Sequence, residues 1–254
     1  IFPLSGFWSK DAILIEAPTG EQMLVDSGRS RAVLEKLGEI LWPWDRHINA
    51  ILSTHPQLDH IGEFDEIADR YRIDRAYETG QRANTPTQDT YDAAIEQQGI
   101  ERVFVKSGDS LDLGAVQVLV VAPDADDRGR ELKEPNDGSI TLLISYGETT
   151  ILLTGDASVS EESEMLNDLL KPVDVLKVAH HGSKYNTTAE FLHAIKPRIA
   201  IISVGSNSYG HPTEAVLSRL HDVGAEIFRT DQDGDVLVRS FGNEPEIIPS
   251  ALLF

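Results

Sequence analysis

Four side chains that can bind a metal ion lie close together in one short segment of the chain. His55, Gln57, Asp59 and His60 follow the largely apolar run at residues 48–52, which predicts a buried strand. Neutral imidazole and carboxylate groups suit zinc, manganese or iron, and an incomplete set of ligands leaves room for water or substrate. Taken alone, the segment is also compatible with a polar turn that contains two histidines by chance.

Two further groups of the same kind occur later in the chain. Asp156 follows the apolar run at residues 150–153, and the pair His180 and His181 follows another at residues 173–178. Each group therefore comes after a predicted strand, and open α/β folds place their ligand sites at the carboxyl ends of strands. Three such endings favour a metal site over a chance turn.

The elements that precede these groups follow the same order in two parts of the chain. Each part predicts a hairpin ending in an aspartate, then a helix, a strand and a histidine. The first part comprises residues 11–16, 22–25, Asp26, 31–41, 48–52 and His55; the second comprises 139–144, 150–153, Asp156, 161–170, 173–178 and His180. Such repetition indicates two related halves whose loops meet at one edge.

The rest of the chain supplies further short elements. Helices are predicted at residues 63–72, 87–98, 188–195 and 213–221, the last capped by Thr213, and a loop at 124–136. Strands are predicted at residues 101–106, 117–121 and 198–203, with edge strands at 225–228 and 235–240. We therefore expect one domain over residues 1–254, with halves at roughly 1–125 and 136–254.

The histidine and aspartate motifs resemble the signature of the metallo-β-lactamase fold, with Asp156 and His181 at its later ligand positions. More narrowly, several segments resemble the hydrolase domain at the C-terminal end of ComEC-type competence proteins. They are residues 11–16, 54–62, 153–156, 175–183 and 209–212, and residues 230–234 also fit. The resemblance covers nearly the whole chain. It implies an α/β fold, a four-layer αββα sandwich built from two related halves.

The resemblance also implies a set of metal ligands. Asp59, His60 and His181 would form one site, and Asp156 would bridge to another that holds His55. A bridging carboxylate holds two cations close together, which favours activation of a water molecule between them.

Two departures from the family weaken the site around His55. Gln57 stands where the family has His or Asp, and Asn136 stands in place of the family's usual third histidine. Both offer only a neutral amide oxygen, which is a weaker ligand. We therefore expect one firmly bound divalent ion, zinc or manganese, and a second that is loose or absent.

The remaining polar residues near these motifs are expected to serve catalysis and substrate binding. The predicted catalytic residues are Asp59, His180 and His211, where His211 protonates the leaving oxygen or contacts phosphate. The predicted substrate-binding residues are Asn136, Ser183, Lys184 and His211. Asp26 is expected to support the loop that carries His55 by accepting hydrogen bonds. Phe7 and Trp8 would pack in the core or narrow the mouth of the pocket.

Composition limits the functions that are compatible with this chain. It has 254 residues, of which 41% are hydrophobic and 25% charged, so it can bury a sizeable core. The absence of cysteine excludes disulfides and thiolate ligands. A formal net charge of −20 repels phosphate, which argues against tight non-specific binding to duplex DNA.

The sequence leaves the location of the chain open. No apolar run approaches the roughly 20 residues needed to span a bilayer, so a soluble domain is expected. Because the sequence opens at Ile1 without a methionine, a mature product or a domain excised from a longer protein is expected. The resemblance implies membrane helices upstream, which would place the domain at a membrane or outside the cytoplasm.

The sequence is compatible with three functions. The resemblance favours a phosphodiesterase or nuclease that acts on DNA, single-stranded DNA included, or on another phosphodiester during DNA uptake. A β-lactamase- or lactonase-type hydrolase is the alternative, because one fold hosts many chemistries. The third is a degenerate binding domain without turnover, which the change to Gln57 and the acidic charge would favour.

Overall fold

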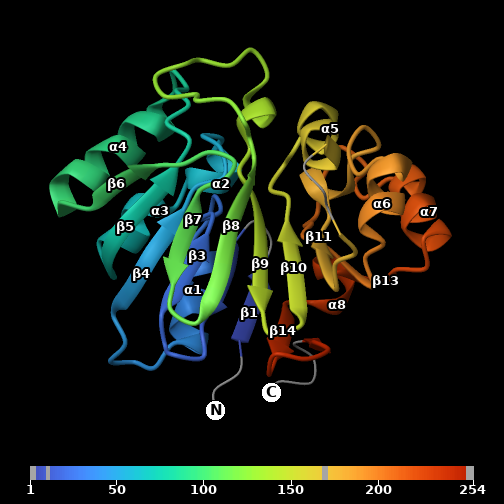
Figure 1. The fold of residues 1–254 in the computed structure, drawn as a ribbon. Helices are drawn as coiled ribbons and strands as arrows, with labels where there is room; N and C mark the ends of the chain where they lie inside the picture. Colours follow the sequence, from blue (N-terminus) through green and yellow to red (C-terminus); the bar gives the residue numbers. More distant parts are fainter. Residues whose placement is uncertain (1–3, 10–11, 168–170, 250–254) are drawn as a thin grey trace.

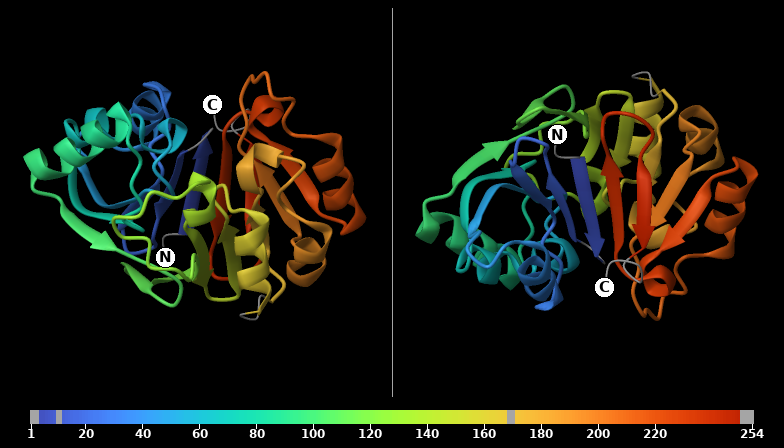
Figure 2. Two further views of the ribbon diagram at one scale, coloured as in Figure 1. Left: turned by 90° about the horizontal axis from the view of Figure 1, so that it is seen from above. Right: turned by 90° about the horizontal axis from the view of Figure 1, so that it is seen from below.

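Two β-sheets stack face to face in the computed structural model, and helices cover the outer face of each sheet (Figures 1 and 2). The structure describes the backbone of residues 4–9, 12–167 and 171–249, and side chains over 12–166 and 171–248. This arrangement is the four-layer αββα sandwich that the motifs predicted.

The first sheet contains eight strands in the order β15-β14-β1-β2-β3-β4-β5-β6. Its strands are β1 (Leu4–Ser9), β2 (Ala12–Glu16), β3 (Gln22–Val25), β4 (His47–Leu52), β5 (Arg72–Glu78), β6 (Glu101–Phe104), β14 (Val236–Ser240) and β15 (Glu246–Pro249). The second sheet contains seven strands in the order β13-β12-β11-β10-β9-β8-β7. Its strands are β7 (Ser110–Leu113), β8 (Val116–Ala122), β9 (Thr141–Tyr146), β10 (Thr149–Leu153), β11 (Val175–Lys177), β12 (Ile199–Ile202) and β13 (Glu226–Arg229).

Helices connect the strands and form the two outer layers. They are α1 (Ala32–Ile40), α2 (Leu58–Ile61), α3 (Phe64–Ala68), α4 (Pro86–Gln98), α5 (Val159–Asn167), α6 (Ala189–Ile195), α7 (Glu214–Asp222) and α8 (Thr230–Asp233), with 3-10 turns η1 (Pro135–Gly138) and η2 (Ala179–Gly182). Helices α1, α3 and α4 pack on the first sheet, and α5, α6 and α7 pack on the second. Among the described residues, no helix is both long and apolar enough to cross a bilayer.

The strand pairing repeats between the two sheets. Strands β1, β2 and β3 pair antiparallel and are followed by parallel pairing through β4, β5 and β6. Strands β8, β9 and β10 pair antiparallel in the same way and are followed by parallel pairing through β11, β12 and β13. Strands β7 and β8 pair with each other in the second sheet, and β14 and β15 join the first sheet beside β1, so each sheet contains strands from both ends of the chain.

Strand β4 shows why the strands before the metal motifs are so apolar. Ile51 packs against the helices of the first outer layer, and Leu52 packs between the two sheets. Both side chains are fully buried. Burial of one such side chain stabilises the fold by about 1.5–3 kcal/mol. The strand is therefore anchored on both faces, and the loop that follows it starts from a fixed point.

Several expectations about individual elements need correction. The helix predicted over residues 63–72 ends at Ala68, and residues 72–78 form strand β5, which lies between β4 and β6. The strand was not predicted because charged residues alternate with apolar ones at its start, where only one face of the strand is buried. Residues 236–240 are not an edge strand, because β14 lies between β15 and β1.

Two further outcomes concern the ends of helices, and one concerns side chains that the structure does not describe. Thr213 precedes α7 as predicted, but its hydroxyl donates to the Gly182 carbonyl and does not cap the helix. The helix predicted over residues 161–170 starts at Val159 and is described as far as Asn167. The roles predicted for Phe7 and Trp8 concern side chains outside the described residues.

Candidate metal centre

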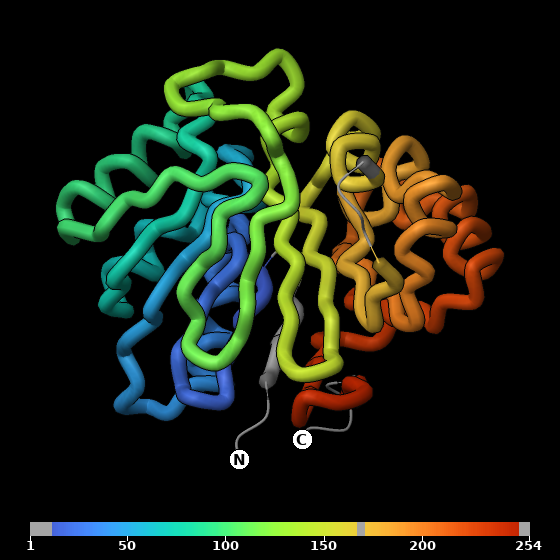
Figure 3. The backbone as a smooth tube through the Cα atoms, in the orientation of Figure 1, coloured from blue at the N-terminus to red at the C-terminus, as the bar shows by residue number. Residues whose placement is uncertain are grey.

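The loops that follow β3, β4, β10 and β11 meet at one end of the sandwich, beside α2 (Figure 1). The segment between β8 and η1 arches over the same end (Figure 3). Asp26, His180 and His181 all have positive φ angles there, of 59°, 48° and 53°. Such angles cost a non-glycine residue about 1–2 kcal/mol. Strained backbone is thus concentrated where the predicted ligands gather.

Asp59, His60 and His181 form one group whose ligand atoms lie within 4.8 Å of one another. Asp156 lies against this group, with its Oδ2 atom 3.6 Å from His60 Nε2 and 3.8 Å from His181 Nε2. Two ligands bound about 2.1 Å from the same ion are roughly 3–4 Å apart. The structure therefore brings together the residues predicted for the firm site, including the predicted bridge.

A second group consists of His55, His60 and Asp156, so the two groups share His60. The Nδ1 atom of His60 is 2.7 Å from Asp26 Oδ2, which leaves only Nε2 for a metal ion. One imidazole nitrogen has one lone pair and binds one ion. Because His60 can bind only one ion, only one of the two groups can offer all three of its ligands to an ion at a time.

Each ligand histidine is held in one tautomer by a partner for its Nδ1–H. The acceptors are Asp26 for His60 at 2.7 Å, Thr54 Oγ1 for His55 at 3.1 Å, and the Ser203 carbonyl for His181 at 2.9 Å. Such partners orient a metal-binding imidazole and raise its basicity. Asp26 has the supporting role expected from the sequence. No sequence signal identified Thr54 or Ser203.

Three buried atoms in the centre make no hydrogen bond within the described part of the chain. They are His55 Nε2, His60 Nε2 and Asp156 Oδ1. An unsatisfied buried polar atom costs about 1–3 kcal/mol, and more if it is charged. An ion in the group of His55, His60 and Asp156 would satisfy all three atoms. The donor set of imidazole nitrogen and carboxylate oxygen therefore fits a divalent ion such as zinc or manganese.

The charges of the buried groups differ in the metal-free protein. Burial, together with the nearby His60, lowers the pKa of His55 well below its usual value. Burial also opposes charge on His60, but Asp26 and Asp156 outweigh it and raise the pKa of His60 well above its usual value. Although burial opposes ionisation of Asp156, the neighbouring histidines, with His60 first, hold its pKa well below the usual range. His60 is thus an imidazolium paired with two carboxylates.

Gln57, Asn136 and His180 form a polar chain beside the centre. Gln57 Nε2 donates to Asn136 Oδ1 at 2.8 Å, and Asn136 Nδ2 lies 3.3 Å from His180 Nδ1. When Asn136 donates to Nδ1, His180 carries its proton on Nε2, which lies 3.9 Å from Asp156. In this tautomer the His180 Nε2–H can donate a hydrogen bond, while His181 Nε2 faces the metal group, 3.9 Å from Asp59 Oδ2 and 3.8 Å from Asp156 Oδ2. Gln57 turns its amide nitrogen toward Asn136.

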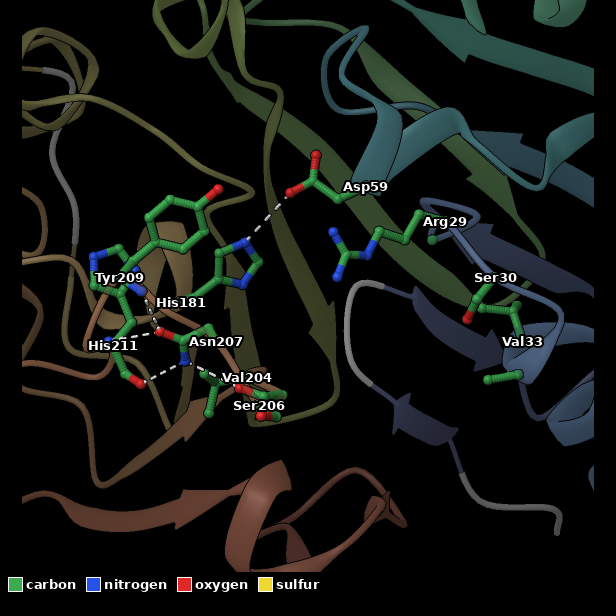
Figure 4. Close-up of a pocket in the computed structure, with 13 residues that line it drawn as sticks. Arg29, Ser30, Val33, Asp59, His181, Val204, Ser206, Asn207, Tyr209 and His211 are labelled. Carbon is green, nitrogen blue, oxygen red and sulfur yellow. Dashed lines mark hydrogen bonds and ion pairs between the residues drawn. The ribbon is translucent and has the colours of Figure 1, made fainter.

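His211 lines a cavity of about 210 Å³ together with Asp59 and His181 (Figure 4). Its ring lies 5.8 Å from that of His180. Burial first, and then His180 and His181, lowers the pKa of His211. The Asn207 side chain bonds both the N–H and the carbonyl of His211, at 3.1 and 2.8 Å. This clamp, which the sequence analysis missed, holds His211 at the cavity.

Of the four predicted substrate-binding residues only His211 lines the cavity, and Asn136, Ser183 and Lys184 do not. Ser183 is 3% exposed, and its hydroxyl accepts a hydrogen bond from the Tyr185 N–H. Lys184 is exposed, but its ammonium lies 4.8 Å from the centre of the Tyr185 ring. Neither residue lines the cavity. Substrate binding by these residues therefore stays a prediction that the lining of this cavity does not support.

Replacing Thr54 by valine should weaken metal binding by about tenfold or more, because His55 loses the acceptor for its Nδ1–H. The Thr54 hydroxyl also donates to Asp26 at 2.9 Å, so the free energy of unfolding should fall by about 1–3 kcal/mol. Calorimetric titration with zinc and denaturant unfolding measure the two effects. Thr54→Ser keeps the hydroxyl and is the control; equal losses in both variants would contradict the prediction.

Comparison with known proteins agrees with this geometry. The sequence profile of the metallo-beta-lactamase superfamily matches residues 5–206. ComE operon protein 3 of Bacillus subtilis is 33% identical over 196 residues, which are 76% of this chain and 25% of that protein. Recombination protein 2 of Haemophilus influenzae is 38% identical over 113 residues, covering 44% of this chain and 14% of that protein. The chain thus spans about a quarter or less of these relatives, which are ComEC-like competence proteins as the motifs predicted.

Solved structures share the fold at low sequence identity. The metallo-beta-lactamase fold protein YhfI from Bacillus subtilis has a TM-score of 0.62 at 12% identity, covering 91% of this chain and 97% of that one. Tm1679, described as a metal-dependent hydrolase of the beta-lactamase superfamily, has a TM-score of 0.61 at 10% identity, covering 92% and 98%. The profile match covers most of the chain, and the strand order and the centre of histidines and aspartates agree with it. The chain therefore belongs to the metallo-beta-lactamase superfamily.

Proposed function

We propose that this chain is a metal-dependent phosphodiester hydrolase that acts on nucleic acid. The observation that carries the proposal is one cavity that joins the metal group, through Asp59 and His181, to a clamped histidine, His211. Hydrolysis of a phosphodiester needs a cation for the developing charge and a proton for the leaving oxygen. The cavity offers residues for both needs.

A divalent ion held by Asp59, His60, His181 and Asp156 would supply Lewis acidity for the phosphoryl group and for the attacking water. The protein's own residues do the rest. Asp26 and Ser203 keep His60 and His181 oriented. His211 lies at the cavity beside His180. As an imidazolium it can pass a proton to the leaving alcohol, and in the neutral form that its lowered pKa favours it can donate a hydrogen bond to the leaving oxygen.

Support for a nucleic-acid substrate comes from the relatives and from charge. The names of the matched proteins refer to competence and recombination, which are processes that handle DNA. The net charge of −20 disfavours a duplex, whose affinity depends on many Lys and Arg contacts to phosphate. A single strand that enters one cavity needs fewer such contacts. We therefore favour a single-stranded substrate.

Hydrolysis of bis-p-nitrophenyl phosphate with added manganese or zinc tests the proposal. We expect turnover that requires metal, and His211→Gln should lower kcat by about a hundredfold or more while the metal content stays unchanged. His221→Gln changes a histidine at the end of α7, outside the cavity, and is the control.

Two outcomes would overturn the proposal. Bound metal without phosphodiester turnover would point to β-lactams or lactones as substrates. Neither metal nor turnover would leave a binding domain whose site has lost its ions.

A further inference from the structure

Arg29 is a cationic side chain that lines the metal cavity. It extends into the cavity from the side opposite His211 and Tyr209 (Figure 4). Arg29 is exposed, and within the described residues it forms no ion pair or hydrogen bond. Its neighbour Arg31 lies 3.6 Å from Glu66 and does not line the cavity. The two arginines are therefore in different environments.

The lack of a partner is informative in so acidic a chain. The sequence has 42 acidic and 22 basic residues, so carboxylates outnumber cations almost two to one. Most described arginines, including Arg75, Arg102 and Arg198, pair with a carboxylate. An arginine that remains unpaired inside a cavity is available to an anionic ligand. The planar guanidinium binds phosphate through two parallel hydrogen bonds.

The backbone beside Arg29 is tied to the loop that carries the metal ligands. Ser27 N donates to the His60 carbonyl at 2.6 Å, and Glu63 N donates to the Gly28 carbonyl at 3.1 Å. Gly28 has a φ of +67°, and a Cβ there would lie 2.9 Å from Val33. These contacts fix the backbone from which the Arg29 side chain extends relative to Asp59 and His60.

The opposite side of the cavity presents an aromatic ring. Tyr209 is 82% exposed, and its ring lies 6.1 Å from that of His211. Its N–H donates to Asn207 Oδ1 at 3.1 Å, so the clamp that holds His211 also holds Tyr209. An exposed aromatic ring on a cavity wall is a surface on which a nucleobase can stack.

We propose that Arg29 and Tyr209 form a nucleotide-binding subsite beside the metal group. Arg29 binds a phosphate group, and Tyr209 stacks on the base attached to the same strand. This inference rests on the proposed function and names the residues that recognise its substrate. It also explains how an acidic protein can bind a polyanion locally, through one arginine and one ring and without a basic surface.

Equilibrium binding to the metal-loaded protein tests the subsite without relying on turnover. The probes are inorganic phosphate and thymidine 5′-phosphate, titrated calorimetrically. Arg29→Gln should weaken both probes by about tenfold, because a charge-assisted pair is lost. Tyr209→Ala should weaken thymidine 5′-phosphate by about tenfold and leave inorganic phosphate unchanged. Metal content should stay at the wild-type level in both variants.

The matched controls are Arg31→Gln and Tyr185→Ala, whose side chains are exposed outside the cavity. Both should bind the two probes as the wild type does. The inference fails if Arg29→Gln binds inorganic phosphate normally, or if Tyr209→Ala affects both probes equally. If no variant hydrolyses a phosphodiester but the binding pattern holds, the proposed function falls and the anion subsite stands.

Discussion

Replacing Asp156 by asparagine should lower metal-dependent phosphodiester hydrolysis by a factor on the order of a thousand or more. Asp156 is 1% exposed, and its Oδ2 atom lies 3.6–3.9 Å from the Nε2 atoms of His60, His180 and His181. Its other oxygen, Oδ1, makes no hydrogen bond within the described residues. The substitution keeps the shape of the side chain but removes the negative charge of a member of one ligand group that also lies against the other group.

Metal content and thermal unfolding separate this loss from a folding defect. In the wild type, added zinc should raise Tm, because an ion that binds only the folded state stabilises it. In Asp156→Asn the rise should disappear, while the Tm without metal identifies a folded protein. Asp124→Asn changes an exposed carboxylate in the loop after β8 and should behave as the wild type. Full metal content with full activity in Asp156→Asn would contradict the assigned site.

Lowering the pH should weaken metal binding by about tenfold per unit across the neutral range. In the metal-free protein Asp26 and Asp156 raise the pKa of His60 well above its usual value, although burial opposes its charge. The Nε2 proton of His60 must therefore leave before an ion can bind. Below this raised pKa, each fall of one pH unit lowers the fraction of deprotonated His60 tenfold, and the metal affinity falls with it. Above this pKa the affinity should level off. His55 is already neutral, because burial lowers its pKa.

Calorimetric titration with zinc at neutral pH, in two buffers of different ionisation enthalpy, measures the proton released. We expect about one proton per ion from His60. Asp26→Asn removes one of the two carboxylates that stabilise the imidazolium, so the level region should begin at a lower pH. An affinity that is constant between pH 6 and pH 8 would show that His60 does not compete with the metal ion.

The features that the sequence determined are local in origin. His55, Asp59 and His60 lie in one loop, so their proximity follows from their spacing once a strand precedes them. Asp156 and His181 also follow strands, and parallel strands bring their carboxyl ends to one edge. The repeated order of hairpin, helix and strand predicted two related halves, and the resemblance of the motifs to the metallo-β-lactamase fold implied the αββα sandwich that the structure shows.

Contacts between distant segments depended on the tertiary structure. Local periodicity contains no information about partners 79 residues apart, as Gln57 and Asn136 are, or about the crossing of β14 to the first sheet. Strand β5 escaped prediction because charged residues alternate on its exposed positions. The position of Arg29 in the cavity depends on how its loop packs against α2. Sequence motifs therefore identified most candidate metal ligands, whereas long-range packing determined their tautomers, the role of His180 and the groups available to a substrate.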